Sequence, residues 1–324
     1  MQHALAYLNG HYIPADELSL PVFDAGFVQG ATITEQVRTF AGNIFCLDAH
    51  LQRLARGLEI TGIDPGITIS ELAAVAESLV RKNHALLQQG DDLGLSIFIT
   101  PGPYSTLLPT QPTRGNKGEK NFSRQGRRPE VSSQATVCLH TYLLPFHLWD
   151  KKYRVGESLV VSDVRQIPSE CWPPELKCRS RMHYFLADKQ AQARDPQDKA
   201  LLRNLQGNIT ETSTANIVLY FRDSGLVSPP REEVLAGISL RALQQIAHDQ
   251  SIPFVFKELT PRDVLSADEA FLTSTPYCLL PIVRLDRKPI GTGEPGLMYT
   301  HLLASWGAEL KIELVAQAER FARR

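Results

Sequence analysis

The chain has 324 residues with 43% hydrophobic and 21% charged side chains, a composition typical of a soluble globular protein large enough for two domains. The formal net charge of −1 argues against a nucleic-acid-binding surface over the whole molecule. The five cysteines form no C-x-x-C pair, so a zinc or redox motif has no support and a reducing compartment is favoured. Because there is no signal-peptide pattern and no run of about 18 apolar residues, we expect a cytoplasmic protein that does not cross a membrane.

The first half of the chain begins with alternating patterns typical of β-hairpins. In LAYLNGHYIP the apolar positions alternate around Asn9-Gly10, a strong hairpin signal, and VRTFAGNIFCL turns at Gly42-Asn43. Two amphipathic helices follow, with Asp48 and Ser70 as their expected N-caps. The elements predicted over the first half are hairpins at 5–14 and 37–47, helices at 49–62 and 71–88, and strands at 93–100 and 135–144.

The segment 111–134 differs from its surroundings because it is basic, poor in apolar residues and without a period. Its charged residues are Arg114, Lys117, Lys120, Arg124, Arg127 and Arg128 against Glu119 and Glu130, which is six minus two, or +4. Such a composition predicts a flexible surface loop. The alternative is a basic lid that becomes ordered over an anionic substrate.

The second half mixes strands and helices. We place an N-terminal domain at 1–146, a linker at 147–157 and a C-terminal domain at 158–324. The apolar positions of ISLRALQQIAHDQ recur at helical spacing. The elements predicted in this half are strands at 159–167, within 199–230 and within 267–286, and helices at 179–194, 238–250 and 298–321.

Two residues could carry chemistry with an aldehyde cofactor. Lys177 follows a Pro-rich turn, and a lysine with a lowered pKa forms a Schiff base with an aldehyde, although a lone lysine is usually a solvated surface residue. Glu211, in GNITETSTAN, could keep the ring nitrogen of a pyridine cofactor protonated. The alternative for Glu211 is a turn residue, because Gly207-Asn208 precedes it.

Three segments could bind the phosphate of such a cofactor. LAGIS (235–239) leads directly into a helix, so its backbone N–H groups and the helix dipole favour an anion. LTSTP (272–276) offers hydroxyl groups at a strand end, and Arg53 in HLQRL could add a charge-assisted bond. Each of these segments is common on its own.

In this order, the motifs YLNG, DAGFVQG, HLQRL, NITE, LAGIS and ADEAFLTST resemble the class IV, fold-type IV aminotransferases that use pyridoxal 5'-phosphate (PLP). That family includes branched-chain aminotransferases, D-amino-acid aminotransferases and aminodeoxychorismate lyases. The separation 211 − 177 = 34 is similar to the lysine-to-glutamate spacing of its branched-chain members. The resemblance implies an α/β fold with a smaller N-terminal α/β domain and a larger C-terminal pseudo-barrel domain, in a homodimer.

The resemblance also implies roles for individual residues. Lys177 falls on the Schiff-base lysine, which also moves the proton, and Glu211 falls on the partner of the pyridine nitrogen. The other implied PLP-binding residues are Arg53, Leu235, which packs on the ring face, and the phosphate-binding Gly237, Ile238, Ser239 and Thr275. No metal is implied.

The pattern departs from the family where the substrate would bind. Gln36 stands where branched-chain enzymes have Gly, Met182 where they have Tyr, and the strand at 93–100 lacks their Tyr-x-Arg pair. Arg38 matches a basic position of the family and is one candidate for the substrate carboxylate. An arginine of the segment 111–134 is another. Alternatively, Arg38 forms a structural ion pair at the domain edge.

We therefore predict an aminotransferase that moves an amino group between a branched-chain-like amino acid and a 2-oxo acid by a ping-pong mechanism. The alternative is a lyase similar to aminodeoxychorismate lyase, because Arg38 and His50 are 50 − 38 = 12 residues apart, as in that branch, and Gln36 suits a polar substrate. A D-amino-acid aminotransferase or a PLP-binding protein without turnover are further alternatives.

Overall fold

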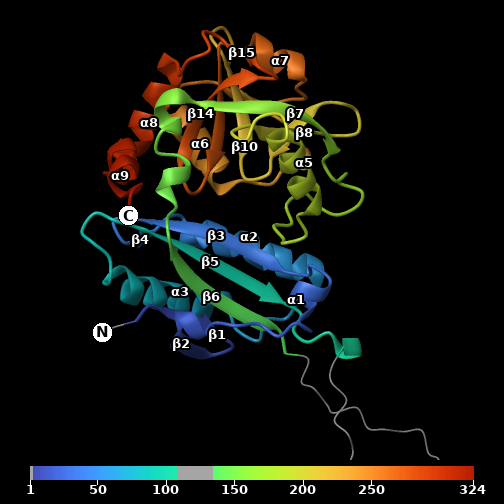
Figure 1. The fold of residues 1–324 in the computed structure, drawn as a ribbon, viewed down its shortest axis with the longest axis vertical. Helices are drawn as coiled ribbons and strands as arrows, with labels where there is room; N and C mark the ends of the chain where they lie inside the picture. Colours follow the sequence, from blue (N-terminus) through green and yellow to red (C-terminus); the bar gives the residue numbers. More distant parts are fainter. Residues whose placement is uncertain (1–2, 108–133) are drawn as a thin grey trace, which may run out of the picture.

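The computed structural model describes residues 3–107 and 134–324 and contains two β-sheets stacked along the long axis of the molecule (Figure 1). The first sheet is antiparallel, in the order β2-β1-β6-β5-β3-β4. Its strands are β1 (Leu5–Leu8), β2 (His11–Pro14), β3 (Ile33–Phe40), β4 (Asn43–Ile44), β5 (Leu93–Thr100) and β6 (Thr136–Leu143). The two predicted hairpins are confirmed as β1–β2 and β3–β4.

Two helices, α2 (Leu47–Thr61) and α3 (Ile69–His84), pack on this sheet and bury one apolar cluster with it, and the short helix α1 (Ala25–Val28) precedes β3. Both predicted N-caps are wrong by two residues. Cys46 precedes α2 in a left-handed conformation, so Asp48 lies in the first turn, where its charge still suits the helix dipole. Thr68 caps α3 because Thr68 and Glu71 form a reciprocal capping box, which leaves Ser70 inside the helix.

The second sheet closes on itself, which confirms the predicted pseudo-barrel. Its order is β12-β11-β10-β13-β14-β7-β8-β9, with β15 added to β14, and β9 pairs again with β10. The pairs β7–β8, β7–β14 and β11–β12 are parallel. The strands are β7 (Glu157–Arg165), β8 (Lys199–Arg203), β9 (Ile209–Thr212), β10 (Asn216–Phe221), β11 (Gly225–Ser228), β12 (Phe254–Phe256), β13 (Glu269–Ser274), β14 (Cys278–Leu285) and β15 (Lys288–Pro289).

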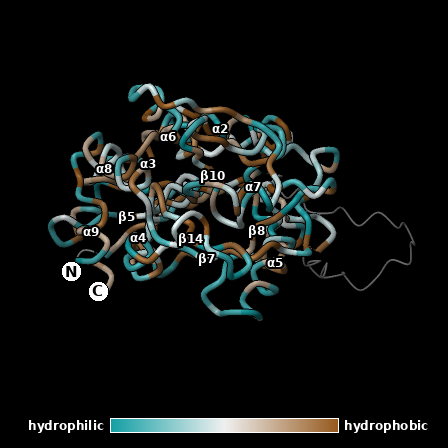
Figure 2. Tube along the Cα trace, turned by 90° about the horizontal axis from the view of Figure 1, so that it is seen from above, coloured by the Kyte–Doolittle hydropathy of each residue, from teal (hydrophilic) through white to brown (hydrophobic). Residues whose placement is uncertain are grey.

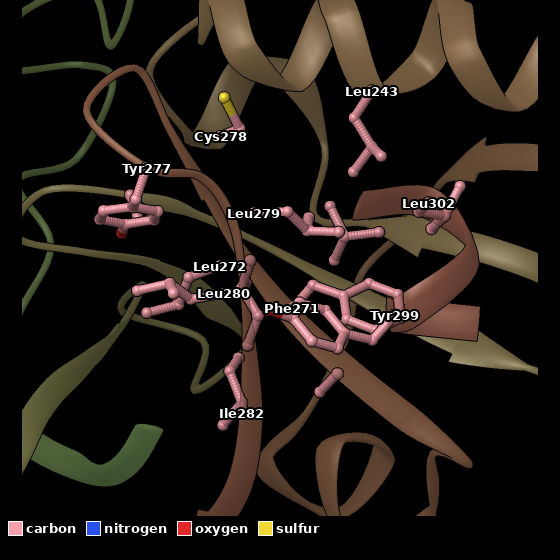
Figure 3. Packing of buried hydrophobic residues seen from close by; sticks show 14 of the residues in the cluster. Leu243, Phe271, Leu272, Tyr277, Cys278, Leu279, Leu280, Ile282, Tyr299 and Leu302 are labelled. Carbon is pink, nitrogen blue, oxygen red and sulfur yellow. The ribbon is translucent and has the colours of Figure 1, made fainter. Parts of the chain in front are cut away.

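Helices cover the barrel and complete its core. They are α5 (Met182–Gln192), α6 (Ile238–Asp249), α7 (Pro261–Ser266), α8 (Leu297–Leu310) and α9 (Leu314–Phe321). Figure 3 shows Leu243 of α6 and Leu302 of α8 near the aromatic pair Phe271 and Tyr299, whose ring centroids are 6.3 Å apart. The apolar faces of these helices therefore seal one side of the strands.

Two predicted helices have different boundaries, and the segment predicted as a linker contains a short helix. The helix predicted at 298–321 is two helices, because Lys311 is left-handed (φ 55°) and ends α8. The helix predicted from 179 begins at Met182, because Arg179 lies in a bend and its N–H donates to the carbonyl of Thr32, just before β3. The segment 147–157 contains the short helix α4 (Lys152–Val155), and its side chains Trp149 and Tyr153 are buried in the core of the second sheet.

The segment around Lys177 connects the two sheets. The N–H of Thr34 donates to the carbonyl of Lys177 and the N–H of Arg179 donates to Thr32, each at 3.0 Å, beside a bridge between Ile33 and Cys178. Seen from above, α2 and α6 lie next to each other across this junction (Figure 2). No helix in the described residues is long and apolar enough to cross a membrane.

Candidate functional site

A cavity of about 300 Å³ lies where the two sheets meet, a volume suited to a small organic ligand. One wall comes from β3 and β6, a second from the segment 177–184, and the third from the loops after β9 and β13 and the start of α6. All predicted cofactor-binding residues line it: Arg53, Lys177, Glu211, Leu235, Gly237, Ile238, Ser239 and Thr275.

The carbonyl of Lys177 accepts from the N–H of Thr34 in β3, so the position of Lys177 depends on both sheets. Burial lowers the pKa of its ammonium to about 8, and the charge of Arg53 acts in the same direction, while Glu35 opposes it. A lysine with this pKa is partly neutral near physiological pH, and the neutral amine is the nucleophilic form.

Glu211 lies in β9, beside β10, with 5% of its surface exposed. Its Oε1 accepts hydrogen bonds from Tyr184 Oη at 2.7 Å and Gln166 Nε2 at 3.0 Å, and its Oε2 accepts from Asn216 Nδ2 at 3.1 Å and the N–H of Leu235 at 3.2 Å. Burial raises the pKa of Glu211, although the hydrogen bonds from Tyr184 and Leu235 oppose the shift. No cationic side chain of the described residues lies within 4.0 Å of this carboxylate, so it can accept a cationic ligand group.

The start of α6 forms an anion cradle. Gly237 is the N-cap and no side chain caps the helix, so its first N–H groups are available to a ligand. A Cβ on Gly237 would lie 2.0 Å from Asn216 Oδ1, so only glycine fits there. Ser239 Oγ lies 3.4 Å from Thr275 Oγ1, which brings the two predicted hydroxyl groups together.

Arg53 is fixed beside this cradle by a buried carboxylate that sequence reasoning missed. Glu35 accepts two hydrogen bonds of 2.7 Å from Arg53 Nε and NH2, and Arg53 NH1 donates to the carbonyl of Ala236 at 2.7 Å. Burial would raise the pKa of Glu35, but Arg53 and His50 lower it to about 2. Burial lowers the pKa of His50, whose neutral Nδ1–H donates to Glu35 at 2.7 Å. The alternation of side chains along β3 could have indicated this role. Glu35 points to α2, whereas the side chains before and after it in sequence line the cavity.

Of the three predicted substrate residues, the structure brings only Gln36 into the cavity. Arg38 is 1% exposed, and its guanidinium donates to the carbonyls of Pro276 and Thr39 and to Gln317 Oε1. These neutral acceptors hold Arg38 at the junction of the domains instead of the ion pair considered above. Met182 is 68% exposed and lies outside the cavity lining because α5 turns it outward. The arginines between 114 and 128 fall outside the described residues.

Several cavity residues were missed because nothing in their local sequence marks them. Tyr142 comes from β6, Arg179 and Arg181 follow Lys177, and Tyr184 comes from the first turn of α5. Gln166 supports Glu211 from the end of β7, and its Oε1 lies 3.1 Å from His183 Nε2. In the described residues no group of three or more His, Cys, Asp or Glu side chains could hold a metal ion.

The closed barrel joined to an antiparallel α/β domain is the fold-type IV architecture. It is similar to the branched-chain amino acid aminotransferase of Thermobaculum terrenum, solved in its PLP form (TM-score 0.76, 19% identity, 99% of this chain and 97% of that one). It is also similar to the branched-chain enzyme of Escherichia coli (TM-score 0.80, 18% identity, 95% and 94%). These likenesses confirm the predicted fold.

The family model for amino-transferase class IV matches residues 32–285, and the chain belongs to this family. A D-alanine aminotransferase of Bacillus licheniformis is 26% identical over 89% of this chain and 90% of its own length. The predicted class of enzyme is thereby confirmed. The names of the relatives differ in the amino acid, so family membership leaves the substrate open.

Proposed function

We propose that this protein is a PLP-dependent transaminase that moves an amino group between an amino acid and a 2-oxo acid. The observation that supports this most strongly is the combination of three anchors in one cavity. Lys177 suits an aldehyde, the buried carboxylate of Glu211 suits a protonated ring nitrogen, and the start of α6 suits a phosphate. An aldehyde, a ring nitrogen and a phosphate are three of the polar groups of PLP, so the residues present fit this cofactor.

Each anchor has a separate task. Arg53, the N–H groups after Gly237, and the hydroxyls of Ser239 and Thr275 would hold the phosphate. Glu211 would hold the ring nitrogen in its protonated state, and the Leu235 side chain would pack on the ring, since the N–H of Leu235 is fixed to Glu211 at 3.2 Å. When bound, PLP supplies an electron sink that makes the Cα–H of an attached amino acid acidic.

The remaining chemistry belongs to Lys177. Once displaced by the substrate amine, its own amine would take the proton from the substrate Cα and return it to the cofactor carbon. A pKa of about 8 allows both steps near neutral pH, because the amine can accept and release a proton there. The amino acid and the 2-oxo acid would use the same cavity in turn, which is ping-pong behaviour.

A lyase reaction on a polar amino acid is the second candidate. It uses the same lysine and carboxylate. The polar cavity wall formed by Gln36 and Tyr142 suits a polar substrate. The homodimer and the branched-chain-like donor expected from the sequence remain predictions. Sedimentation would test the first, and substrate profiles would test the second.

The test is the visible absorbance of the purified protein with PLP. L- and D-amino acids are added singly, followed by a 2-oxo acid, and Lys177→Ala serves as control. Loss of the cofactor band with one amino acid and its recovery with the oxo acid is the expected result. Release of pyruvate from aminodeoxychorismate without an oxo acid would establish the lyase. A protein that forms no lysine-bound PLP, or a Lys177→Ala variant as active as the parent, would overturn both.

A further inference from the structure

The cavity holds more positive charge than the cofactor explains. In the described part of the chain its lining includes four cationic side chains and a single acidic one, Glu211. The four cations are Arg53, Lys177, Arg179 and Arg181. In the proposed function, Arg53 serves the phosphate while Lys177 and Glu211 serve the aldehyde carbon and the ring nitrogen. Arg179 and Arg181 remain, and neither has a carboxylate of the described residues within 4.0 Å.

Within the described residues, the guanidinium of Arg179 has only one weak polar contact. Its NH2 lies 3.4 Å from the hydroxyl of Ser96, at the long limit of a hydrogen bond. Desolvation and the neighbouring charge of Arg181 both lower the pKa of Arg179, so an anion at this place would relieve both effects. Since an arginine guanidinium stays charged in proteins, the surroundings favour an anionic ligand.

Arg181 follows Arg179 by two residues in the sequence. More contacts hold its guanidinium in place than hold that of Arg179. Its NH2 donates to the carbonyl of Ser213, and its Cζ lies 4.6 Å from the centroid of the Tyr184 ring. These contacts leave other N–H groups of the guanidinium without a carboxylate partner in the described residues. The cavity thus presents two oriented guanidinium groups, one toward the barrel loops and one toward the N-terminal sheet.

The wall beside Arg179 is built to be polar. Gln36 Nε2 donates to Ser96 Oγ at 2.8 Å, and Tyr142 Oη donates to Gln36 Oε1 at 3.0 Å. The Tyr142 ring reaches Gln36 only because Gly94 on the intervening strand has no side chain, since a Cβ there would lie 2.2 Å from the ring. An aliphatic substrate side chain on this wall would desolvate polar groups without replacing their hydrogen bonds.

We propose that Arg179 and Arg181 bind the two carboxylates of a dicarboxylic amino acid or 2-oxo diacid, with Arg179 selecting the side-chain acid. This inference rests on the proposed transaminase function and defines its substrate class. It is an alternative to the branched-chain-like donor expected from the sequence, because a hydrocarbon side chain would leave Arg179 without a counter-charge. Gln36 and Tyr142 position Arg179 through Ser96 and shape the polar wall.

The test compares glutamate with glutamine, which differ in charge but hardly in shape, using the enantiomer that reacts. We expect the parent enzyme to prefer glutamate by at least about tenfold in kcat/KM. Arg179→Met should raise the KM for glutamate about 10- to 100-fold, the range for losing one charge-assisted hydrogen bond. The kcat/KM for glutamine should change less than about threefold, since the rest of the site is intact. Arg222→Met, a surface change at a residue that is ion-paired to Asp268 outside the cavity, is the matched control.

A second readout needs no turnover. Calorimetric titration of the PLP-loaded protein with glutarate, an unreactive diacid, should give binding that Arg179→Met weakens about tenfold or more and Arg179→Lys weakens less. Equal glutarate affinity in the parent and Arg179→Met, or a parent that prefers leucine or glutamine to glutamate, overturns the inference and leaves the transaminase intact. Glutarate binding that depends on Arg179 in a protein that transaminates no amino acid overturns the proposed function instead.

Discussion

Replacing Glu211 by Gln removes one negative charge from a buried position and keeps the shape of the side chain. The N–H of Leu235 cannot turn around, so the new amide oxygen has to face it, and the new NH2 then faces Tyr184 Oη and Gln166 Nε2. The tyrosine hydroxyl can accept instead of donating. Gln166 cannot easily turn, since its Oε1 is engaged by His183 at 3.1 Å. At least one buried donor is therefore left unpaired, at a cost of about 1 to 3 kcal/mol.

The effect on the cofactor is larger than the effect on the fold. The charge-assisted bond from the ring nitrogen to Glu211 is lost, and bonds of this kind contribute about 1.5 to 3 kcal/mol. We expect the Kd for PLP to rise about 10- to 100-fold. The value of kcat should fall about 100- to 1000-fold, the range for removing one preorganised electrostatic partner. Fluorescence titration of the cofactor and steady-state kinetics at saturating PLP separate the two effects.

The matched control is Glu175→Gln, because Glu175 is partly exposed and lies outside this cavity, and its ion pair in the described part of the chain is with the exposed Arg56 at 3.2 Å. It should leave both constants unchanged. If Glu211→Gln keeps the Kd for PLP and kcat within about threefold of the parent, Glu211 is not the partner of the ring nitrogen. The assignment of the cavity to PLP would then lose its main electrostatic support.

Three further changes test other parts of the site. Tyr184→Phe removes a hydrogen-bond donor that lowers the pKa of Glu211, so the pKa of Glu211 should rise further. The acid limb of the pH–rate profile should therefore move to higher pH, and an acid limb that stays in place would contradict this. Lys177→Met should raise the Tm of the cofactor-free protein at pH 7. Because the folded pKa of about 8 lies below the ordinary 10.5, the unfolded chain binds more protons, and the gain should shrink between pH 8 and 10.5. In Gly237→Ala the new Cβ should displace Asn216 from Glu211. The free energy of unfolding, measured with denaturant, should fall by about 1 to 3 kcal/mol, and PLP binding should weaken. An unchanged stability would show that the loop can move to accept the Cβ.

The cofactor end of the site could be predicted because each of its parts is local in sequence. Lys177 follows its own turn, Glu211 belongs to a short hairpin, and the residues 235–239 combine a loop with the start of a helix. A motif of this kind carries its own backbone geometry, and the family resemblance that the order of these motifs carries implied that they share one site. The predicted N-caps Asp48 and Ser70 were wrong because several adjacent residues could serve as the N-cap, and the surrounding fold decides among them.

The substrate end could not be predicted because it depends on cross-strand register. Gln36 faces Ser96 on the next strand, Tyr142 crosses Gly94 to reach Gln36, and Arg179 joins them from the other domain. No local pattern links these positions, which lie up to 179 − 36 = 143 residues apart. The same register places Arg38 outside the cavity lining. Arg38 shares the cavity face of β3 with Gln36. At this position, two residues further along the strand, Pro276 and Gln317 cover the strand and accept hydrogen bonds from the guanidinium, which therefore lies in the contact between the two domains. A basic residue on the correct face can therefore reach a ligand only where the two domains leave space, and Arg179, which lines the cavity, is the residue we propose for that role.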